Sequence, residues 1–253
     1  MKKPSLKLLA AALSLTFAGF ANQASATHSW GGYHWARQSN PFTLKLGDNV
    51  SSVWDPILAT TSSDWTQSSV LNTTIVAGST TARRCKPTSG RVEVCDERYG
   101  NNGWLGLAQI WISGTHITQG AVKVNDTYFN TSTYNTPAWR NLVMCQEVGH
   151  TLGLDHQDTD FNNANLGTCM DYTSNPLGPP DNEHPNQHDY DELGIIYAHP
   201  DSTTTVAQAS ASAAAMPRAM TENDYAERSQ WGRLIRSSKN GLKEVYQIGR
   251  AHV

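Results

Sequence analysis

The chain has 253 residues, of which 38% are hydrophobic, and this is enough for one well-buried domain with appendages at its ends. The formal net charge is −3 and only 16% of the residues are charged, so no basic surface for nucleic acid is expected. Most of the remaining residues are polar but uncharged, a composition more typical of an extracellular protein than of a disordered one.

The first 26 residues have the pattern of a secretory signal peptide. Three lysines among the first seven residues form a positive start, residues 8–20 form an apolar run, and residues 24–26 read Ala-Ser-Ala, a small-x-small cleavage site. The alternative, an anchoring helix, is disfavoured because the apolar run is too short to span a bilayer comfortably. We therefore predict that residues 1–26 are removed and that the mature protein is exported and soluble.

The four cysteines of an exported chain are expected to form disulfides, with three possible pairings. Cys85 and Cys95 are close in sequence and separated by a stretch rich in Pro, Ser and Gly, so we expect them to close one loop. Cys145 is then expected to pair with Cys169. Zinc binding by the cysteines is the alternative, but no Cys-x-x-Cys spacing supports it.

The first part of the mature chain predicts a helix followed by strands. Apolar and aromatic residues recur at helical spacing over residues 53–65, where Pro56 is tolerable only near the first turn. Four β-rich runs bounded by Gly, Ser, Asn or Pro come next and are predicted to be strands: residues 70–77, 92–95, 104–112 and 116–125. A loop rich in Asn and Thr is predicted after them.

A second helix is predicted from Pro137 to Gly153. Thr136 is a good N-cap, Pro137 suits the first helical position, and Gly153 favours a helix end because glycine adopts positive φ easily. One face of this helix carries five residues at 3.6-residue spacing: Trp139, Leu142, Val143, Gln146 and His150. Residues 155–185 are then predicted to be irregular, and apolar residues within 190–197 indicate a short helix.

The composition divides the mature chain into a domain, a linker and a tail. Residues 27–200 carry the predicted elements, and residues 201–215 form a Ser/Thr/Ala-rich linker. Residues 216–253 form a polar tail, in which Asn240-Gly241 is a hairpin-turn signal. We expect this tail to be truncated, with residues 248–253 non-native, because they back-translate to a common sequencing-adapter sequence.

One string in the second helix combines metal-ligand and acid–base residue types. Gln146 and His150 are one helical turn apart, so their side chains project side by side, and Glu147 lies next to them. A chain that turns at Gly153 returns His156 toward the same place. Imidazole nitrogen suits zinc, a catalytic zinc site takes three protein ligands, and a neighbouring carboxylate accepts a proton from an attacking water.

Residues 146–156 resemble the extended metzincin signature H-E-x-x-H-x-x-G-x-x-H in every defining position except the first, where Gln146 replaces His. Further along the chain, residues 167–172 (Gly-Thr-Cys-Met-Asp-Tyr) resemble the Met-turn of that family, whose methionine, here Met170, lies beneath the metal. The conjunction of helix, glycine turn, second histidine and Met-turn at family spacing is far more specific than any one of these motifs.

The resemblance implies a site and its chemistry. His150, His156 and Gln146 would hold a zinc ion, and Glu147 would act as general base toward a metal-activated water. Tyr172 matches the tyrosine that some metzincins place near the zinc. The reaction expected from this resemblance is the hydrolysis of peptide bonds.

The resemblance also extends to the scaffold and covers about residues 30–200. Residues 106–108 are similar to the edge strand along which metzincins align an extended substrate, so Leu107 and Ala108 are expected to bind substrate. Residues 188–197 resemble the C-terminal helix of the matrixin branch. The implied fold is α+β: a twisted mixed β-sheet with an N-terminal helix and an active-site helix, plus a small irregular lower subdomain ending in a helix.

Gln146 leaves three interpretations open, because zinc prefers imidazole or an anionic ligand to a neutral amide oxygen. Gln146 ligates weakly; or a water or Tyr172 completes a site made by His150 and His156; or the protein is a non-catalytic relative that binds peptides. Retention of Glu147 favours catalysis, since a binding scaffold has no need of a general base there.

We therefore predict a secreted, zinc-dependent metalloendopeptidase, with a catalytically inactive, secreted peptide- or protein-binding protein as the alternative. The expected partner is a polypeptide substrate, with no nucleic acid and no membrane after signal cleavage, and the protein is expected to be a monomer. The remaining histidines singled out here are interpreted as ordinary structural side chains: His34, His116, His184 and His188.

Overall fold

A computed structural model gives the structure of the protein. The described residues are 27–206, 233–237 and 244–247. The predicted signal peptide, most of the predicted linker and residues 248–253 lie outside them. Among the described residues, no helix has the length and apolar character needed to cross a membrane.

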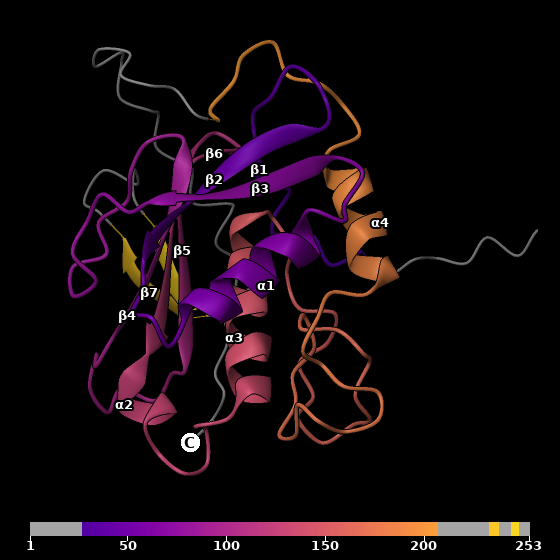
Figure 1. The fold of residues 1–253 in the computed structure, drawn as a ribbon. Coiled ribbons are helices and arrows are strands. Elements are labelled where there is room, and N and C mark those ends of the chain that lie inside the picture. The colour runs from indigo at the N-terminus through magenta and orange to yellow at the C-terminus, as the bar shows by residue number, and fades with distance from the viewer. Residues whose placement is uncertain (1–26, 207–232, 238–243, 248–253) are drawn as a thin grey trace, which may run out of the picture.

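One mixed β-sheet forms a layer of the molecule (Figure 1). Its strands are β1 (His34–Trp35), β2 (Phe42–Asn49), β3 (Leu71–Ala77), β4 (Arg91–Glu97), β5 (Gly106–Ser113) and β6 (His116–Asn125). The order is β1-β6-β4-β2-β3 with all these neighbours parallel, and β5 pairs antiparallel with β6. Within the described part of the chain, β6 is the only strand that pairs with β5, so β5 is an edge strand.

The four strands predicted from the sequence are present, but β2 was not predicted although it lies inside the sheet between β3 and β4. Its side chains alternate as a strand with one buried face requires. Phe42, Leu44 and Leu46 are buried, whereas Thr43 and Lys45 are exposed. The period-2 signal was therefore available in the sequence.

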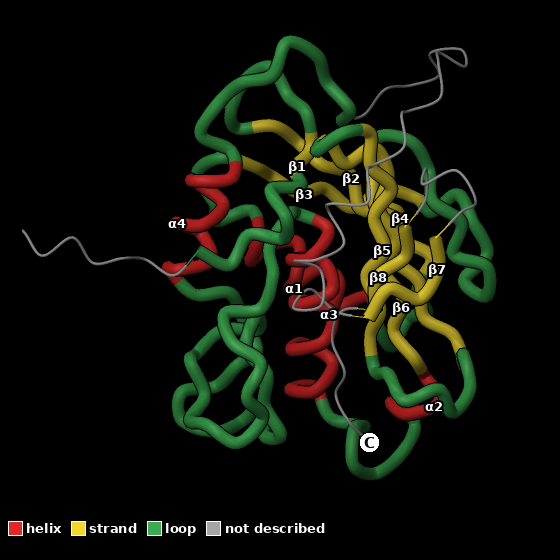
Figure 2. Tube along the Cα trace, turned by 180° about the vertical axis from the view of Figure 1, so that it is seen from behind, coloured by secondary structure: helices red, strands yellow, loops and turns green. Residues whose placement is uncertain are grey.

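Two helices pack together and lie against one face of this sheet (Figure 1): α1 (Asp55–Trp65) and α3 (Pro137–Thr151). Both confirm predicted helices. The Thr136 side chain caps α3 by accepting a hydrogen bond from the Trp139 N–H at 3.3 Å, and Pro137 occupies its first turn. Figure 2 shows α3 from behind, between the strands and the irregular part of the chain.

Residues 155–186 carry turns and isolated bridges, and α4 (Gln187–Ile196) follows them, as predicted. A capping box starts α4, because Asn186 and Asp189 each bond to the backbone of the other. The Tyr197 hydroxyl then donates to the Leu152 carbonyl at 2.8 Å, which ties the end of α4 to the end of α3. This mixed sheet with two helices and an irregular segment ending in a helix is the α+β arrangement expected.

Three short elements complete the description. α2 (Asp126–Phe129) forms where a loop was predicted, and Asn125 caps it by accepting from the Thr127 N–H. β7 (Arg233–Ser237) and β8 (Glu244–Gln247) pair antiparallel, which agrees with the hairpin signal at positions 240–241, themselves outside the described residues. β8 lies beside β5 (Figure 2).

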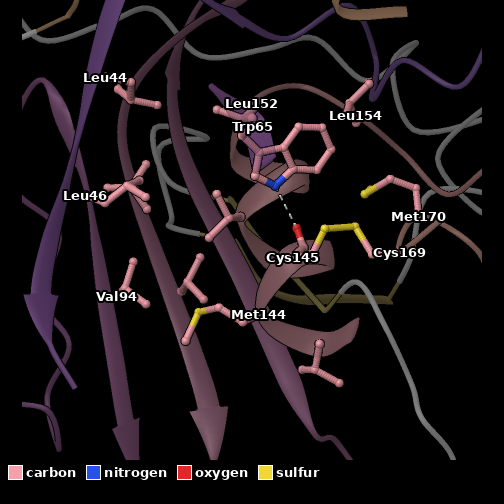
Figure 3. Packing of buried hydrophobic residues seen from close by; sticks show 14 of the residues in the cluster. Leu44, Leu46, Trp65, Val94, Met144, Cys145, Leu152, Leu154, Cys169 and Met170 are labelled. Atoms are coloured by element: carbon pink, nitrogen blue, oxygen red, sulfur yellow. Dashed lines mark hydrogen bonds between the residues drawn. A yellow bond between two sulfur atoms is a disulfide. The ribbon is translucent and has the colours of Figure 1, made fainter. Parts of the chain in front are cut away.

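Disulfides join Cys85 to Cys95 and Cys145 to Cys169, the pairing expected from the sequence. The first ties β4 to the loop that precedes it. The second ties α3 to the segment that carries Met170, and Figure 3 shows it among the buried side chains of the core.

Candidate metal centre

The turn after α3 brings two histidines together. Gly153 has φ 101°, and a Cβ at this position would lie 2.2 Å from the Tyr33 carbonyl oxygen, so only glycine fits. Beyond this turn the chain returns His156 to His150, and their Nε2 atoms are 3.2 Å apart. Both side chains are buried.

The hydrogen-bond partner of each Nδ1 determines whether the Nε2 atom of the same ring carries a hydrogen or a lone pair. His150 Nδ1 lies 2.9 Å from the Leu154 carbonyl oxygen, and His156 Nδ1 lies 3.4 Å from a carboxylate oxygen of Asp155. Because a carbonyl and an ionised carboxylate only accept, each Nδ1 carries the hydrogen. When both rings are neutral, the two Nε2 atoms therefore face each other with their lone pairs. Zinc-binding histidines in proteins commonly have a hydrogen-bond partner of this kind on the other ring nitrogen.

The charge states around this pair favour a cation. Burial, followed by the proximity of His156, lowers the pKa of His150 to about 3, so its imidazole is neutral. Burial alone would raise the pKa of Asp155, but its hydrogen bond and proximity to His156 lower it overall. Two ligands of one tetrahedral zinc lie about 3.3 Å apart, which is close to the observed 3.2 Å between the Nε2 atoms. The residues fit zinc.

Gln146 reaches residues 167–172, the segment that resembles a Met-turn and is called by that name below, with its amide nitrogen. Nε2 lies 2.8 Å from the Cys169 carbonyl oxygen and 3.3 Å from that of Asp171. Two acceptors fix which end of the amide is nitrogen, so Oε1 is the atom of Gln146 that has a ligand's lone pair. Gln146 therefore joins α3 to the Met-turn whether or not it touches a metal.

Glu147 lies beside β5, with only 1% of its surface exposed. Its carboxyl accepts a hydrogen bond from the Ala108 N–H, and within the described part of the chain Oε2 has no hydrogen-bond partner. A Cβ at Gly106 would lie 2.4 Å from Glu147 Oε1, so this glycine makes room for the carboxyl. Burial raises the pKa of Glu147 well above its usual range, and the Ala108 hydrogen bond only partly offsets this.

The Met-turn packs directly against α3. Met170 is fully buried, and a Cβ at Gly149 would lie 2.6 Å from its Sδ and 2.7 Å from Trp65 Cζ2. Trp65 is held in turn, because its indole N–H donates to the Cys145 carbonyl at 3.2 Å (Figure 3). The small residue at position 149 therefore allows the turn to approach the helix.

Tyr172 is placed next to the histidine pair, since its ring centroid lies 4.2 Å from that of His156. Leu107 and Ala108 lie on β5, and Ala108 contacts Glu147 through its N–H. The structure thus brings His150 and His156 into contact, and connects Glu147 to Ala108 and Tyr172 to His156.

Sequence reasoning missed two carboxylates that organise this region. Asp155 orients the His156 ring, as described above. Asp189 is fully buried and accepts hydrogen bonds from His28, Gln157 and Thr168, so it connects the N-terminal segment, the Met-turn and α4. A capping-box spacing after position 186 was the only local signal for Asp189.

No protein-family model and no curated protein matches the sequence. Among solved structures, the chain is similar to myroilysin with 11% identity and a TM-score of 0.38, over 64% of this chain and 82% of that one. It is similar to high choriolytic enzyme 1, a hatching-enzyme zinc protease from the medaka fish Oryzias latipes, with 11% identity and a TM-score of 0.38, over 65% and 94%. It is also similar to archaemetzincin from Archaeoglobus fulgidus, with 12% identity and a TM-score of 0.36, over 60% and 99%.

Proposed function

We propose that this chain is a secreted zinc-dependent metalloendopeptidase of the metzincin type, nearest to its matrixin branch. The observation that carries the proposal is the pair of facing imidazole nitrogens, His150 Nε2 and His156 Nε2, 3.2 Å apart with both Nδ1 atoms turned to acceptors. In the neutral rings this arrangement puts one lone pair of each Nε2 in the same place, as a metal site requires.

His150 and His156 are the proposed zinc ligands, and Gln146 is the proposed third through Oε1. A zinc ion bound there would polarise the substrate carbonyl and lower the pKa of a water molecule. The hydrogen bonds from Gln146 Nε2 to Cys169 and Asp171 hold its amide in one orientation, which limits the entropy that a weak ligand would lose.

Glu147 is the proposed general base. Its Oε2 has no partner within the described part of the chain and can take the proton of the attacking water and return it to the leaving amine nitrogen. The Ala108 N–H holds the carboxyl beside β5. A nearby cation would lower the pKa of Glu147, opposing the effect of burial. Tyr172, packed on His156, is proposed to contact the reacting group.

The proposed substrate is an extended polypeptide bound along β5. An edge strand offers main-chain hydrogen bonds to a peptide, and Leu107 and Ala108, both buried here, are the residues of this strand proposed to make them. Ala108 would use its carbonyl, because its N–H is held by Glu147. Glu147 then lies beside the bound peptide. The two disulfides agree with an oxidising, extracellular location, and cleavage of residues 1–26 is part of the same proposal. The protein is proposed to act as a monomer.

The test is cleavage of a fluorescence-quenched casein by the mature protein, before and after chelator treatment and after return of Zn²⁺. We expect activity to be lost on chelation and restored by zinc. Glu147→Ala should retain zinc and the fold but lose about a hundredfold or more of the activity, a typical loss for a general base. Glu97→Ala, which removes a carboxyl at the end of β4, is the matched control and should cleave normally.

Two results would contradict the proposal. The first is cleavage that is unaffected by chelation or by Glu147→Ala. The second is a correctly folded, zinc-loaded protein that binds unfolded casein without cleaving it, which would favour the alternative of a peptide-binding protein.

A further inference from the structure

A second group of histidines lies away from His150 and His156, where β1 and β6 begin. His34 and His116 are direct partners in the register of these parallel strands, and their ring centroids are 4.9 Å apart. His199 follows α4, and its ring centroid lies 5.1 Å from that of His34. Three imidazoles from distant parts of the sequence therefore share one place.

Asp201 completes this group. Arg37 holds one of its carboxylate oxygens, Oδ2, with its backbone N–H at 3.1 Å and its guanidinium at 2.8 Å. The other oxygen, Oδ1, faces the three Nε2 atoms, at 3.2 Å from His116, 3.6 Å from His34 and 3.8 Å from His199.

One ring nitrogen of His34 is left without a hydrogen-bond partner among the described residues. In the neutral ring, Nδ1 donates to the Gly32 carbonyl at 2.9 Å, which leaves the lone pair on Nε2. The residue is 5% exposed, and within the described part of the chain Nε2 has no hydrogen-bond partner. It is aimed at Asp201 Oδ1, which is also an acceptor. A cation between them would give His34 Nε2 a partner and would replace the hydrogen bond that Oδ1 shares with His116 Nε2 at 3.2 Å.

The ligand set matches zinc. The ligand atoms of His34, His199 and Asp201 all lie within 4.8 Å of one another, and His116 approaches the same oxygen from the strand beside His34. Ligands of one tetrahedral zinc lie about 3.3 Å apart, so shifts of a few tenths of an ångström would complete the site. We propose that His34, His116, His199 and Asp201 bind a structural zinc ion, separate from the proposed catalytic one.

Four protein ligands leave no position for substrate, which is typical of a structural zinc site. Such an ion would fasten the segment after α4 to the start of the sheet, because His199 and Asp201 follow α4 whereas His34 and His116 start β1 and β6. The histidines at positions 34 and 116, interpreted from the sequence as ordinary side chains, acquire a specific role.

The test is zinc stoichiometry of the full chain with His150→Ala and His156→Ala, so that the proposed catalytic site contributes nothing. We expect one tightly held Zn²⁺ per chain after dialysis, and none when His199→Ala is added. His199 has 61% of its side chain exposed, so this change leaves the core intact. The control is His184→Ala, because His184 is also a half-exposed histidine paired with an aspartate, Asp64, and it should keep the ion.

A second measurement covers the case in which the double variant does not fold. In the otherwise wild-type chain, His199→Ala and Asp201→Asn should each lower the zinc content by one ion per chain and abolish part of the rise in melting temperature that Zn²⁺ produces. Equal zinc content in wild type and His199→Ala, or zinc lost equally by His184→Ala, would overturn the proposal. Failure of the casein assay would not affect it.

Discussion

Gly149 gives the sharpest test of how the Met-turn packs on α3. Replacing it with alanine adds one methyl group, which would lie 2.6 Å from Met170 Sδ and 2.7 Å from Trp65 Cζ2. Neither neighbour has solvent to move into, because both side chains are fully buried. The Met170 side chain has some freedom to yield, but the Trp65 ring is fixed by its hydrogen bond to Cys145.

Two effects of opposite sign compete in Gly149→Ala. Alanine in a helix interior is favoured over glycine by about 1 kcal/mol. Inserting a methyl group into a full core typically costs about 1–3 kcal/mol. Because both contacts fall far below normal van der Waals distance, we expect the cost to prevail, with a net loss of about 1–2 kcal/mol in the free energy of unfolding.

Gly194→Ala is the matched control, since it is also a helix glycine but a Cβ there meets no atom within 4 Å. It should stabilise the protein by up to about 1 kcal/mol. Urea unfolding monitored by circular dichroism would measure both variants, compared at equal m-values. A Gly149→Ala protein as stable as Gly194→Ala would refute this packing of Met170 and Trp65.

Three further predictions follow from the site and its surroundings. Gln146→His should tighten zinc binding in a chelator competition, because imidazole is the better ligand, and unchanged affinity in a folded variant would place this residue outside the coordination sphere. Burial, together with Asp126, raises the pKa of Asp96 to about 6 from 3.8. The folded state therefore binds more protons between pH 4 and 6, so the free energy of unfolding should fall by about 3 kcal/mol in all as pH rises from below to above that window. Asp96→Asn should flatten this fall in urea titrations, and an unaltered pH profile would contradict the assignment. Replacing Cys145 and Cys169 by alanine should cost about 3 kcal/mol, seen as a lower urea midpoint, and a wild-type midpoint would show that this crosslink adds nothing.

Local signals explain why α3 and the proximity of His150 to His156 were predictable. A capping threonine, a proline in the first turn and a glycine at the end determine the helix within a short stretch of sequence. The same helix fixes His150, and the glycine turn returns His156 after six residues. Because every step is local, residue spacing was a sufficient guide.

The features that were missed depend mostly on contacts between distant parts of the chain. His34, His116 and Asp201 meet only because β1 pairs with β6 and the segment after α4 folds back onto Arg37. The orientation of the Gln146 amide likewise depends on carbonyls of the Met-turn. β2 differs, since its alternating pattern was present in the sequence.

The central claim is that a zinc ion lies between His150 and His156. Anomalous difference maps on either side of the zinc absorption edge, from crystals of the mature protein, test it most directly. We predict a zinc-specific peak about 2.1 Å from Nε2 of both rings. A well-ordered pair of rings with no such peak, in crystals grown with Zn²⁺, would contradict the claim.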